Sequence, residues 1–171
     1  MSTPPNVTGG TYRGRPLTSV VAEDVINGGC SLRVEMWILN ESGLAAATGN
    51  TLVPSWTASP DTPLHSHAIF DNVNQMMPIG ASTKSKVAGH SPNPVPMAPV
   101  ATSNGDMVIG AVAAGVAGTY TAQNGFTLGL TQSRTSGGTT AHGIGHKTAN
   151  GSSETVSMIG RTSLYRHAAL A

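Results

Sequence analysis

The sequence predicts an all-β protein: an antiparallel β-sandwich of about eight to nine short strands. Turn-forming residues recur at short intervals, with 21 glycines and 11 prolines in 171 residues. Between them lie short runs that carry apolar residues at alternate positions, which is typical of strands. Helical propensity is confined to 41–50, where Gly43 and Gly49 leave room for only a turn or two.

The clearest strand is 30–39, in which every second residue is apolar. The apolar positions are Leu32, Val34, Met36 and Ile38. This alternation predicts one buried face, with Trp37 on the opposite face. Further strands are expected at 17–25, 50–58, 64–73, 105–114, 125–133, 139–147, 154–162 and 163–171.

The N-terminal residues predict a different kind of segment. Residues 1–10 contain Pro4 and Pro5 together with Gly9 and Gly10, so we expect an extended arm and no central strand. Residues 11–171 are then expected to form a single β-sandwich domain. The four prolines within 89–99 predict an extended connector or an edge segment, because proline cannot donate to a ladder.

Charge and cysteine content argue against several classes of partner. Charged residues make up 10% of the chain and the formal net charge is +1. Without a Lys/Arg cluster we expect no nucleic-acid partner. Cys30 is the single cysteine, which excludes an intrachain disulfide and a thiolate zinc site. With neither a secretory signal nor a long apolar run, we expect no membrane partner and synthesis in the cytoplasm.

The histidines form two pairs that raise the question of a metal site. His65 and His67 share one strand face if 64–73 is a strand, and His142 and His146 share a face of another. No carboxylate or thiolate accompanies either pair, and acids that could orient the imidazoles are scarce. We therefore expect no metal and no cofactor, and exposed or interface histidines instead.

Enzymatic chemistry finds little support. The chain has no G-x-S-x-G elbow and no phosphate-binding loop. Its few carboxylates lie in turns or alternate across strands, and nothing selects a pair across a cleft. We expect no catalytic residues and a non-enzymatic protein.

Aromatic residues leave a second class of function open. In a carbohydrate-binding or adhesion module, Trp37, Trp56 and Tyr120 with His65 and His67 would surround a shallow groove and contact a glycan. The competing interpretation is that both tryptophans are structural, because buried aromatic area dominates the cores of small sandwiches.

Five motifs occur in an order that resembles a known module. They are Tyr12 to Thr18, Trp37 to Asn40, Thr51 to Trp56, Phe70 to Ile79 and Gly105 to Ile109. Together they are similar to the jelly-roll-like β-sandwich module of tailed-phage virion proteins and bacterial surface proteins, over about residues 8 to 170. In that module a hairpin of the Y-x-G type precedes a strand ending in an aromatic residue and asparagine, and a corner ending in Pro-Ile follows.

The resemblance implies a virion structural protein, such as a capsid decoration protein or a head or tail accessory subunit. Its partners would be other virion proteins in a capsid or tail lattice and further copies of itself. It would be made in the host bacterial cytoplasm and located in the virion. The module usually has another strand or hairpin before the Y-x-G segment, so we expect an open sheet edge that favours docking.

The resemblance also implies a role for the corner FDNVNQMMPIG at 70–80. Phe70 would pack inward, and Asn72 and Asn74 would satisfy turn backbone groups. Pro78 would stop further pairing. Met76 and Met77 would fill irregular space between the elements.

Overall fold

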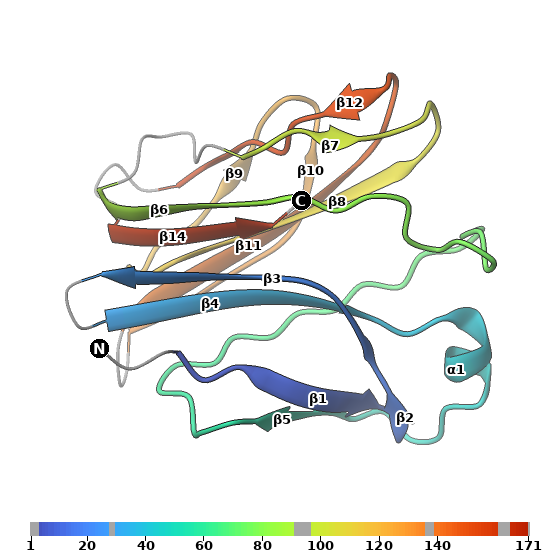
Figure 1. Ribbon diagram of the computed structural model, residues 1–171, viewed down its shortest axis with the longest axis horizontal. Coiled ribbons are helices and arrows are strands. Elements are labelled where there is room, and N and C mark those ends of the chain that lie inside the picture. Colours follow the sequence, from blue (N-terminus) through green and yellow to red (C-terminus); the bar gives the residue numbers. More distant parts are fainter. Residues whose placement is uncertain (1–3, 28–29, 91–96, 136–138, 161–164, 171) are drawn as a thin grey trace.

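The computed structural model describes residues 4–27, 30–90, 97–135, 139–160 and 165–170. Within them the chain is all β apart from the single short helix α1 (Glu41–Ala45), as the sequence predicts. All strand pairs in this part of the chain are antiparallel. The sheets are stacked as Figure 1 shows, so the predicted all-β, sandwich-like fold is confirmed.

The largest sheet has five strands in the order β10-β11-β8-β14-β6. The strands are β6 (Lys84–His90), β8 (Met107–Ala114), β10 (Thr127–Arg134), β11 (Thr140–Thr148) and β14 (Tyr165–Leu170). β8 pairs with β11 without a bulge, from Ala114 opposite Ala141 to Met107 opposite Thr148. This register puts small residues of the two strands side by side on one face.

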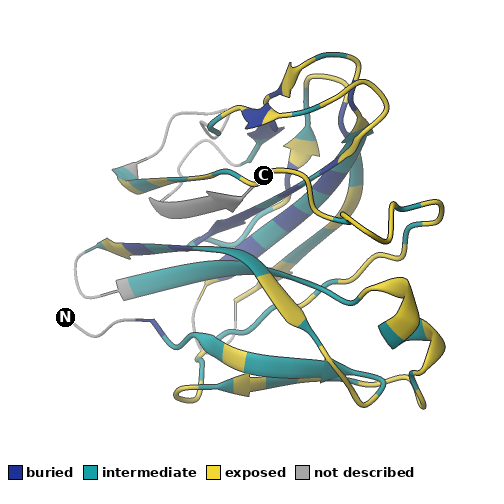
Figure 2. Cartoon of the chain, turned by 45° about the vertical axis from the view of Figure 1, so that its right-hand side comes forward, coloured by how far each residue is buried: buried dark blue, intermediate teal, exposed yellow. Residues whose placement is uncertain are grey.

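The core lies between that face and two short ribbons. One ribbon pairs β7 (Val100–Ala101) with β12 (Ser153–Glu154), and the other pairs β9 (Thr121–Ala122) with β13 (Met158–Ile159). The buried core residues are Val100, Val108, Val112, Ala114, Tyr120, Phe126, Ala141, Ala149, Val156 and Met158. Figure 2 shows this burial concentrated in the sheet's central strands.

Glycines on the core face permit this close layering. A Cβ on Gly110 would overlap the side chain of Val156, and one on Gly143 would lie 3.0 Å from Cβ of Tyr120. The ribbons therefore sit against the sheet at a distance that only glycine allows at these positions.

A long hairpin packs against the same sheet from the other side. It pairs β3 (Thr18–Asn27) with β4 (Cys30–Ile38) and contacts β6, β14 and β8. At its edge, Lys84 and Lys86 of β6 form ion pairs with Glu23 of β3. Figure 1 places this hairpin between the five-stranded sheet and the N-terminal sheet.

The N-terminal sheet corrects the prediction for residues 1–10. β1 (Val7–Tyr12) is the central strand of the sheet β2-β1-β5, between β2 (Arg15–Pro16) and β5 (Leu52–Trp56). Pro4 is buried, and Asn6 exchanges hydrogen bonds with Thr57. The chain from Pro4 onward is thus packed, because both prolines precede the paired residues; residues 1–3 lie outside the described residues.

A tight turn joins β1 to β2. Arg13 and Gly14 have φ of 53° and 76°, and Tyr12 pairs with Arg15 across them. Two consecutive positive φ angles are the geometry of a type I′ hairpin, which matches the right-handed twist of the strands. The hairpin expected at Tyr12 is therefore present.

β4 corrects the prediction of one buried face. Its residues from Ser31 to Ile38 are all partly buried, because the start of β1 lies over the face that carries the polar residues. The Glu35 side chain is only 8% exposed and accepts hydrogen bonds from the Val7 backbone N–H, Arg33 Nε and Trp37 Nε1. Alternation alone did not distinguish a solvated polar face from a hydrogen-bonded polar layer.

Glu35 should be one of the most sensitive polar positions. Glu35→Ala leaves Arg33 Nε and the N–H groups of Val7 and Trp37 without their acceptor, while the other end of the guanidinium keeps Asp24, so we expect a loss of about 2–4 kcal/mol in the free energy of unfolding. Urea denaturation measures this loss. Glu41→Ala, at the exposed start of α1, is the control and should change stability by less than about 0.5 kcal/mol; equal effects would contradict a structural role for Glu35.

Other expected strands have mixed outcomes. The strands predicted at 17–25, 30–39, 50–58, 105–114, 125–133, 139–147 and 163–171 are present, and 154–162 is divided between β12 and β13. The strand predicted at 64–73 is absent, and β6 was not anticipated. Of the connector 89–99, Gly89 and His90 end the edge strand β6, while 91–96 lie outside the described residues.

Candidate protein-interaction surface

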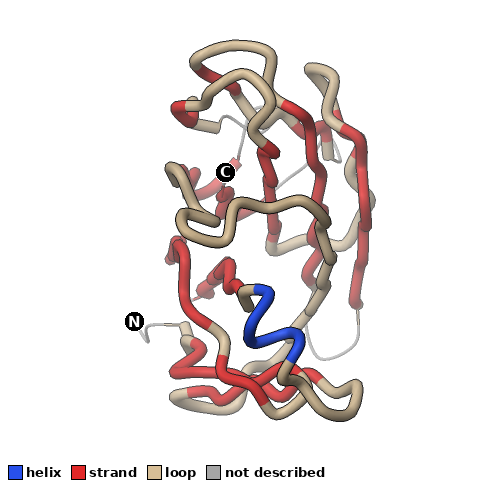
Figure 3. Tube along the Cα trace, turned by 90° about the vertical axis from the view of Figure 1, so that its right-hand side faces the viewer, coloured by secondary structure: helices blue, strands red, loops and turns tan. Residues whose placement is uncertain are grey.

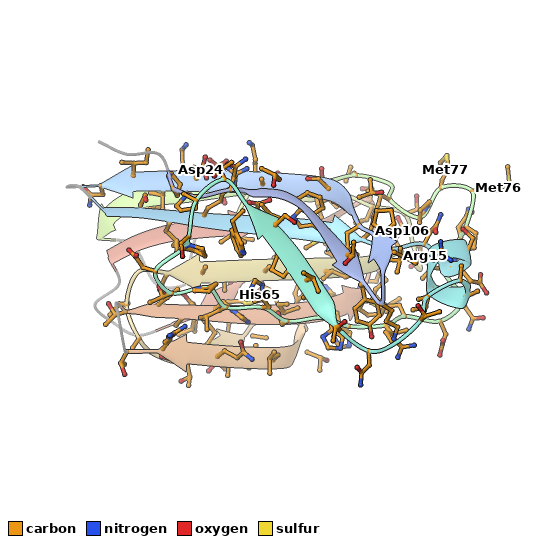
Figure 4. All side chains as sticks on the ribbon, turned by 90° about the horizontal axis from the view of Figure 1, so that it is seen from below. Arg15, Asp24, His65, Met76, Met77 and Asp106 are labelled. Atoms are coloured by element: carbon orange, nitrogen blue, oxygen red, sulfur yellow. The ribbon has the colours of Figure 1, made fainter. Side chains whose placement is uncertain are left out.

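The structure places residues 74–79, here called the methionine corner, at one end of the molecule beside α1. Met76 is 93% exposed, Met77 71% and Ile79 42%. Figure 4 shows both methionines pointing away from the body. The expectation that they fill irregular interior space was wrong, because the corner follows an irregular segment that carries the chain outward and does not leave a core strand.

Local hydrogen bonds hold the methionine corner in shape. The side-chain oxygen of Asn74 accepts from the backbone N–H groups of Met76 and Met77 at 2.9 and 3.3 Å. Gln75 accepts from the Glu41 backbone N–H and donates to the Val73 carbonyl. The expected turn role of Asn74 is confirmed, and the corner is tied to the first residue of α1.

The helix beside the corner is fixed as well. Asn40 caps α1, accepting from the Gly43 backbone N–H at 2.9 Å, and Arg15 Nε donates to the Ala46 carbonyl at the other end. The last turn and the helix therefore keep their orientation relative to β2. Figure 3 looks onto this end of the molecule.

A shallow groove of about 560 Å³ runs between α1, β2 and the corner. Its lining mixes apolar and polar groups: Arg15, Pro16, Thr18, Ile38, Leu39, Asn40, Ser42, Gly43, Ala46, Pro78 and Ile79. A second hollow of about 370 Å³ adjoins it, next to Gln75. Exposed methionines beside a concave surface are a typical composition for a protein-binding patch.

The two edges of the five-stranded sheet differ in how they are protected. β6 carries the exposed Lys84 and Lys86, and edge lysines discourage pairing with another chain. β10 has one charged residue, Arg134 at its end, and a register irregularity between Leu128 and Leu130. The β10 edge is thus less protected than the β6 edge against pairing with another chain.

The histidine pairs are divided among different partners. His65 packs against Trp56 with ring centroids 5.7 Å apart, and His67 against Tyr12 at 5.8 Å. On β11, His146 meets Phe70 edge-on at 6.2 Å. No group of three or more metal-ligating side chains occurs among the described residues.

Two histidines from the two expected pairs nevertheless interact. Partial burial lowers the pKa of His65 below its ordinary value of 6.5. Burial also lowers the pKa of His142, and the nearby His65 lowers it further. Nε2 of His142 is buried with no hydrogen-bond partner.

The aromatic residues expected around a groove do not share one exposed surface. Tyr120 is 3% exposed and lies in the core, so it cannot stack on a ligand. Trp37 is half-buried and donates its indole N–H to Glu35 at 3.1 Å. Trp56 is half-buried against His65, the one pair among these candidates that the structure brings together.

Tyr120 offers a direct test of its structural role. Its hydroxyl oxygen is buried without a hydrogen-bond partner, and burial raises the pKa of the phenol. Because an unpaired buried hydroxyl costs about 1–3 kcal/mol, Tyr120→Phe should be neutral or should stabilise the protein by about 1 kcal/mol. Thermal unfolding measures the change; a loss of more than about 1 kcal/mol would contradict an unpaired hydroxyl.

The comparisons with known proteins add no assignment: no family model, curated protein or solved structure matches this chain. The described residues also include no helix able to cross a bilayer. The methionine corner was missed because methionine is usually an interior residue. The available signal was its setting, since the two methionines lie between Asn-Gln and Pro in a run of turn-forming residues.

Proposed function

We propose that this chain is a structural subunit of a tailed-phage virion, a capsid decoration protein or a head or tail accessory protein with a jelly-roll-like fold. It acts by docking on a repeating protein lattice through the methionine corner and the groove beside α1. The observation that carries the proposal is the high exposure of Met76 and Met77 on a turn fixed by hydrogen bonds. The sequence resemblance supplies the virion setting.

The energetics favour a docking role for this corner. Burying one methionine side chain contributes about 1.5–3 kcal/mol, so Met76 and Met77 together supply a large part of a micromolar affinity, about −8 kcal/mol. Asn74 and Gln75 already order the turn before binding, which reduces the entropy lost on association. Methionine also adapts its shape to an irregular partner surface.

The corner alone is too small for a stable complex. Specific interfaces bury about 1,200–2,000 Å² in total, so neighbouring surfaces must take part. The groove lined by Arg15 and Ile79 adjoins the corner and extends the contact. The edge at β10 is available to a further copy of the chain, which fits assembly into a homo-oligomer.

The alternative function, a carbohydrate-binding or adhesion module, has weaker support. Such sites stack sugars on open aromatic faces, whereas Tyr120 is buried and both tryptophans are half-buried. A glycan array would favour this alternative if sugar retention were specific and lost in Trp56→Ala.

The proposal is tested by locating the protein in phage-producing cells. Virions purified by density gradient should contain the chain in a fixed ratio to the major capsid or tail protein, measured by quantitative mass spectrometry. Recovery of the chain only as a free monomer, with none on particles, would overturn the proposal.

A further inference from the structure

Residues 61–70, here called the strap, run along the five-stranded sheet without joining it. The strap forms no strand, and it runs beside β11 from Thr62, which hydrogen-bonds Thr140 at 2.6 Å, to Phe70, which meets His146. Its other side faces the N-terminal sheet through the ring contacts of His65 and His67. In Figure 4, His65 lies over the strands of the large sheet.

The attachment of the strap depends on histidines. Within the described part of the chain, every aromatic ring pair that holds it includes one: His65 with Trp56, His67 with Tyr12, and His146 with Phe70. A strand at this place would be held by a ladder of backbone hydrogen bonds, which do not depend on pH. The strap instead relies on rings that change charge in the physiological range.

His65 of the strap lies near enough to His142 of β11 to lower the pKa of that histidine. His142 stands on the β11 face opposite the core, in register with Ala113 of β8, and its Nε2 is buried without a partner. A proton on that nitrogen would need a hydrogen-bond acceptor that the site lacks. A second proton on His65 would place two like charges in the same site.

Few other charges are available to compensate. The titratable or charged residues on the strap and its flanking strands, apart from these two, are Asp61, His67, His146, Tyr12, Arg134, Lys147, Cys30, Arg33 and Glu35. Arg134 is a further positive charge, and Lys147 is paired with Glu154. Glu35 is already engaged by Arg33, and Asp61 is exposed at the start of the strap. β5 and β8 contribute no charged side chain.

We propose that the strap is an acid-released cover, held over β11 at neutral pH and detached when His65 and His142 take up protons. Its release uncovers an apolar strip on the second face of the sheet. Ile144 of β11 lies opposite Ala111 of β8 on that strip, between the positions of His142 and His146. Acid thereby changes the binding surface of the protein without unfolding its core, which lies on the other face.

The direction of the pH effect follows from the two histidines. Both have a pKa below 6.5 in the attached state, so the attached strap binds fewer protons than the released strap once the pH falls below 6.5. Attachment is therefore complete above that pH and weakens as the pH falls through the lowered pKa values. Each unit by which one pKa is lowered changes the ratio of attached to released strap tenfold.

The test is nuclear magnetic resonance of the intact chain between about pH 7.5 and about pH 5. Nuclear Overhauser effects between the rings of Trp56 and His65, and between Phe70 and His146, report attachment. We expect both to be present at the higher pH and to disappear together with a midpoint below 6.5. The nuclear Overhauser effect between Tyr120 and Gly143 reports the core and should persist.

His142→Gln removes one titrating group and leaves a neutral side chain of similar reach. In this variant, the pH at which the strap is half released should be lower than in the wild type. His67→Gln is the control, because it changes the strap only at the contact with Tyr12. The Phe70–His146 signal of this control should be lost at the wild-type pH. If His142→Gln does not fold, His65→Gln read through the same Phe70–His146 pair gives the equivalent result.

Three outcomes would overturn the proposal. The first is that the Trp56–His65 and Phe70–His146 ring pairs stay together at about pH 5. The second is that the signal between Tyr120 and Gly143 disappears at the same midpoint as the ring pairs, because acid would then unfold the core as well. The third is an unchanged midpoint in the glutamine variant.

Discussion

Gly110→Ala will lower the free energy of unfolding by about 2–3 kcal/mol, and with it the Tm by about 5–10 °C. The added Cβ would overlap Val156, which is 1% exposed on the opposing layer and cannot move into open space. Relief would require the ribbon layer to separate from the sheet, which would loosen the packing of Val112 and Met158 as well. Thermal unfolding followed by circular dichroism measures the change.

A second substitution isolates the cause. In the Val156→Ala background the overlapping methyl groups are gone, so adding Gly110→Ala should cost less than about 1 kcal/mol. Gly9→Ala is the control, because a Cβ at Gly9, which is also in a strand, meets nothing within 4 Å. If Gly110→Ala costs the same in both backgrounds, the close approach of the layers at this point is refuted.

The second large effect concerns association. Replacing Met76 and Met77 together by serine should weaken the proposed docking on a virion lattice by about 100-fold or more, because two apolar side chains no longer become buried. The fold should be unaffected, since both side chains are exposed in the free protein and the Asn74 hydrogen bonds involve backbone groups. Binding of the purified chain to particles that lack it measures the effect.

Val53→Ser provides a matched control for that experiment. Val53 is 54% exposed on β5, so the change removes apolar surface elsewhere on the molecule. Its affinity for particles should remain within about threefold of wild type. Equal binding by wild type and the double methionine variant would show that the methionine corner is not the docking surface.

The sequence predicted the elements whose local pattern and turn chemistry agree. β8 and β11 are bounded by turn residues, and both strands lie where the sequence predicted them. The Tyr12 to Arg15 hairpin was also predictable, since Gly14 supplies a positive φ. The conformation of these segments follows from their own residues and does not depend on distant parts of the chain.

Elements that depend on distant partners were harder to predict. Residues 64–73 resemble a strand in sequence, but both of their histidines pack on aromatic rings of the N-terminal sheet, and their backbone forms no strand. The prolines and glycines of residues 1–10 argued against a central strand there, but Pro4 and Pro5 come before the paired residues of β1. The buried polar layer around Glu35 depends on β1 and could not be read from β4 alone.

The candidate site was predicted only in outline. The corner at 70–80 was singled out and its Asn74 turn was correctly expected, whereas the exposure of Met76 and Met77 reverses the expected role. Exposure depends on where the preceding segment leads, and the strap leads away from the core. The electrostatic effect of His65 on His142 links residues from two different predicted pairs, which spacing within one strand cannot reveal.

The most direct measurement is an image reconstruction of intact virions that contain this chain. If the proposed function is right, density for the β-sandwich should occupy a repeated position on the capsid or tail, with the corner at Met76 and Met77 facing the underlying lattice protein. Particles that carry no density for the chain, or that hold it with this corner turned toward solvent, would contradict it.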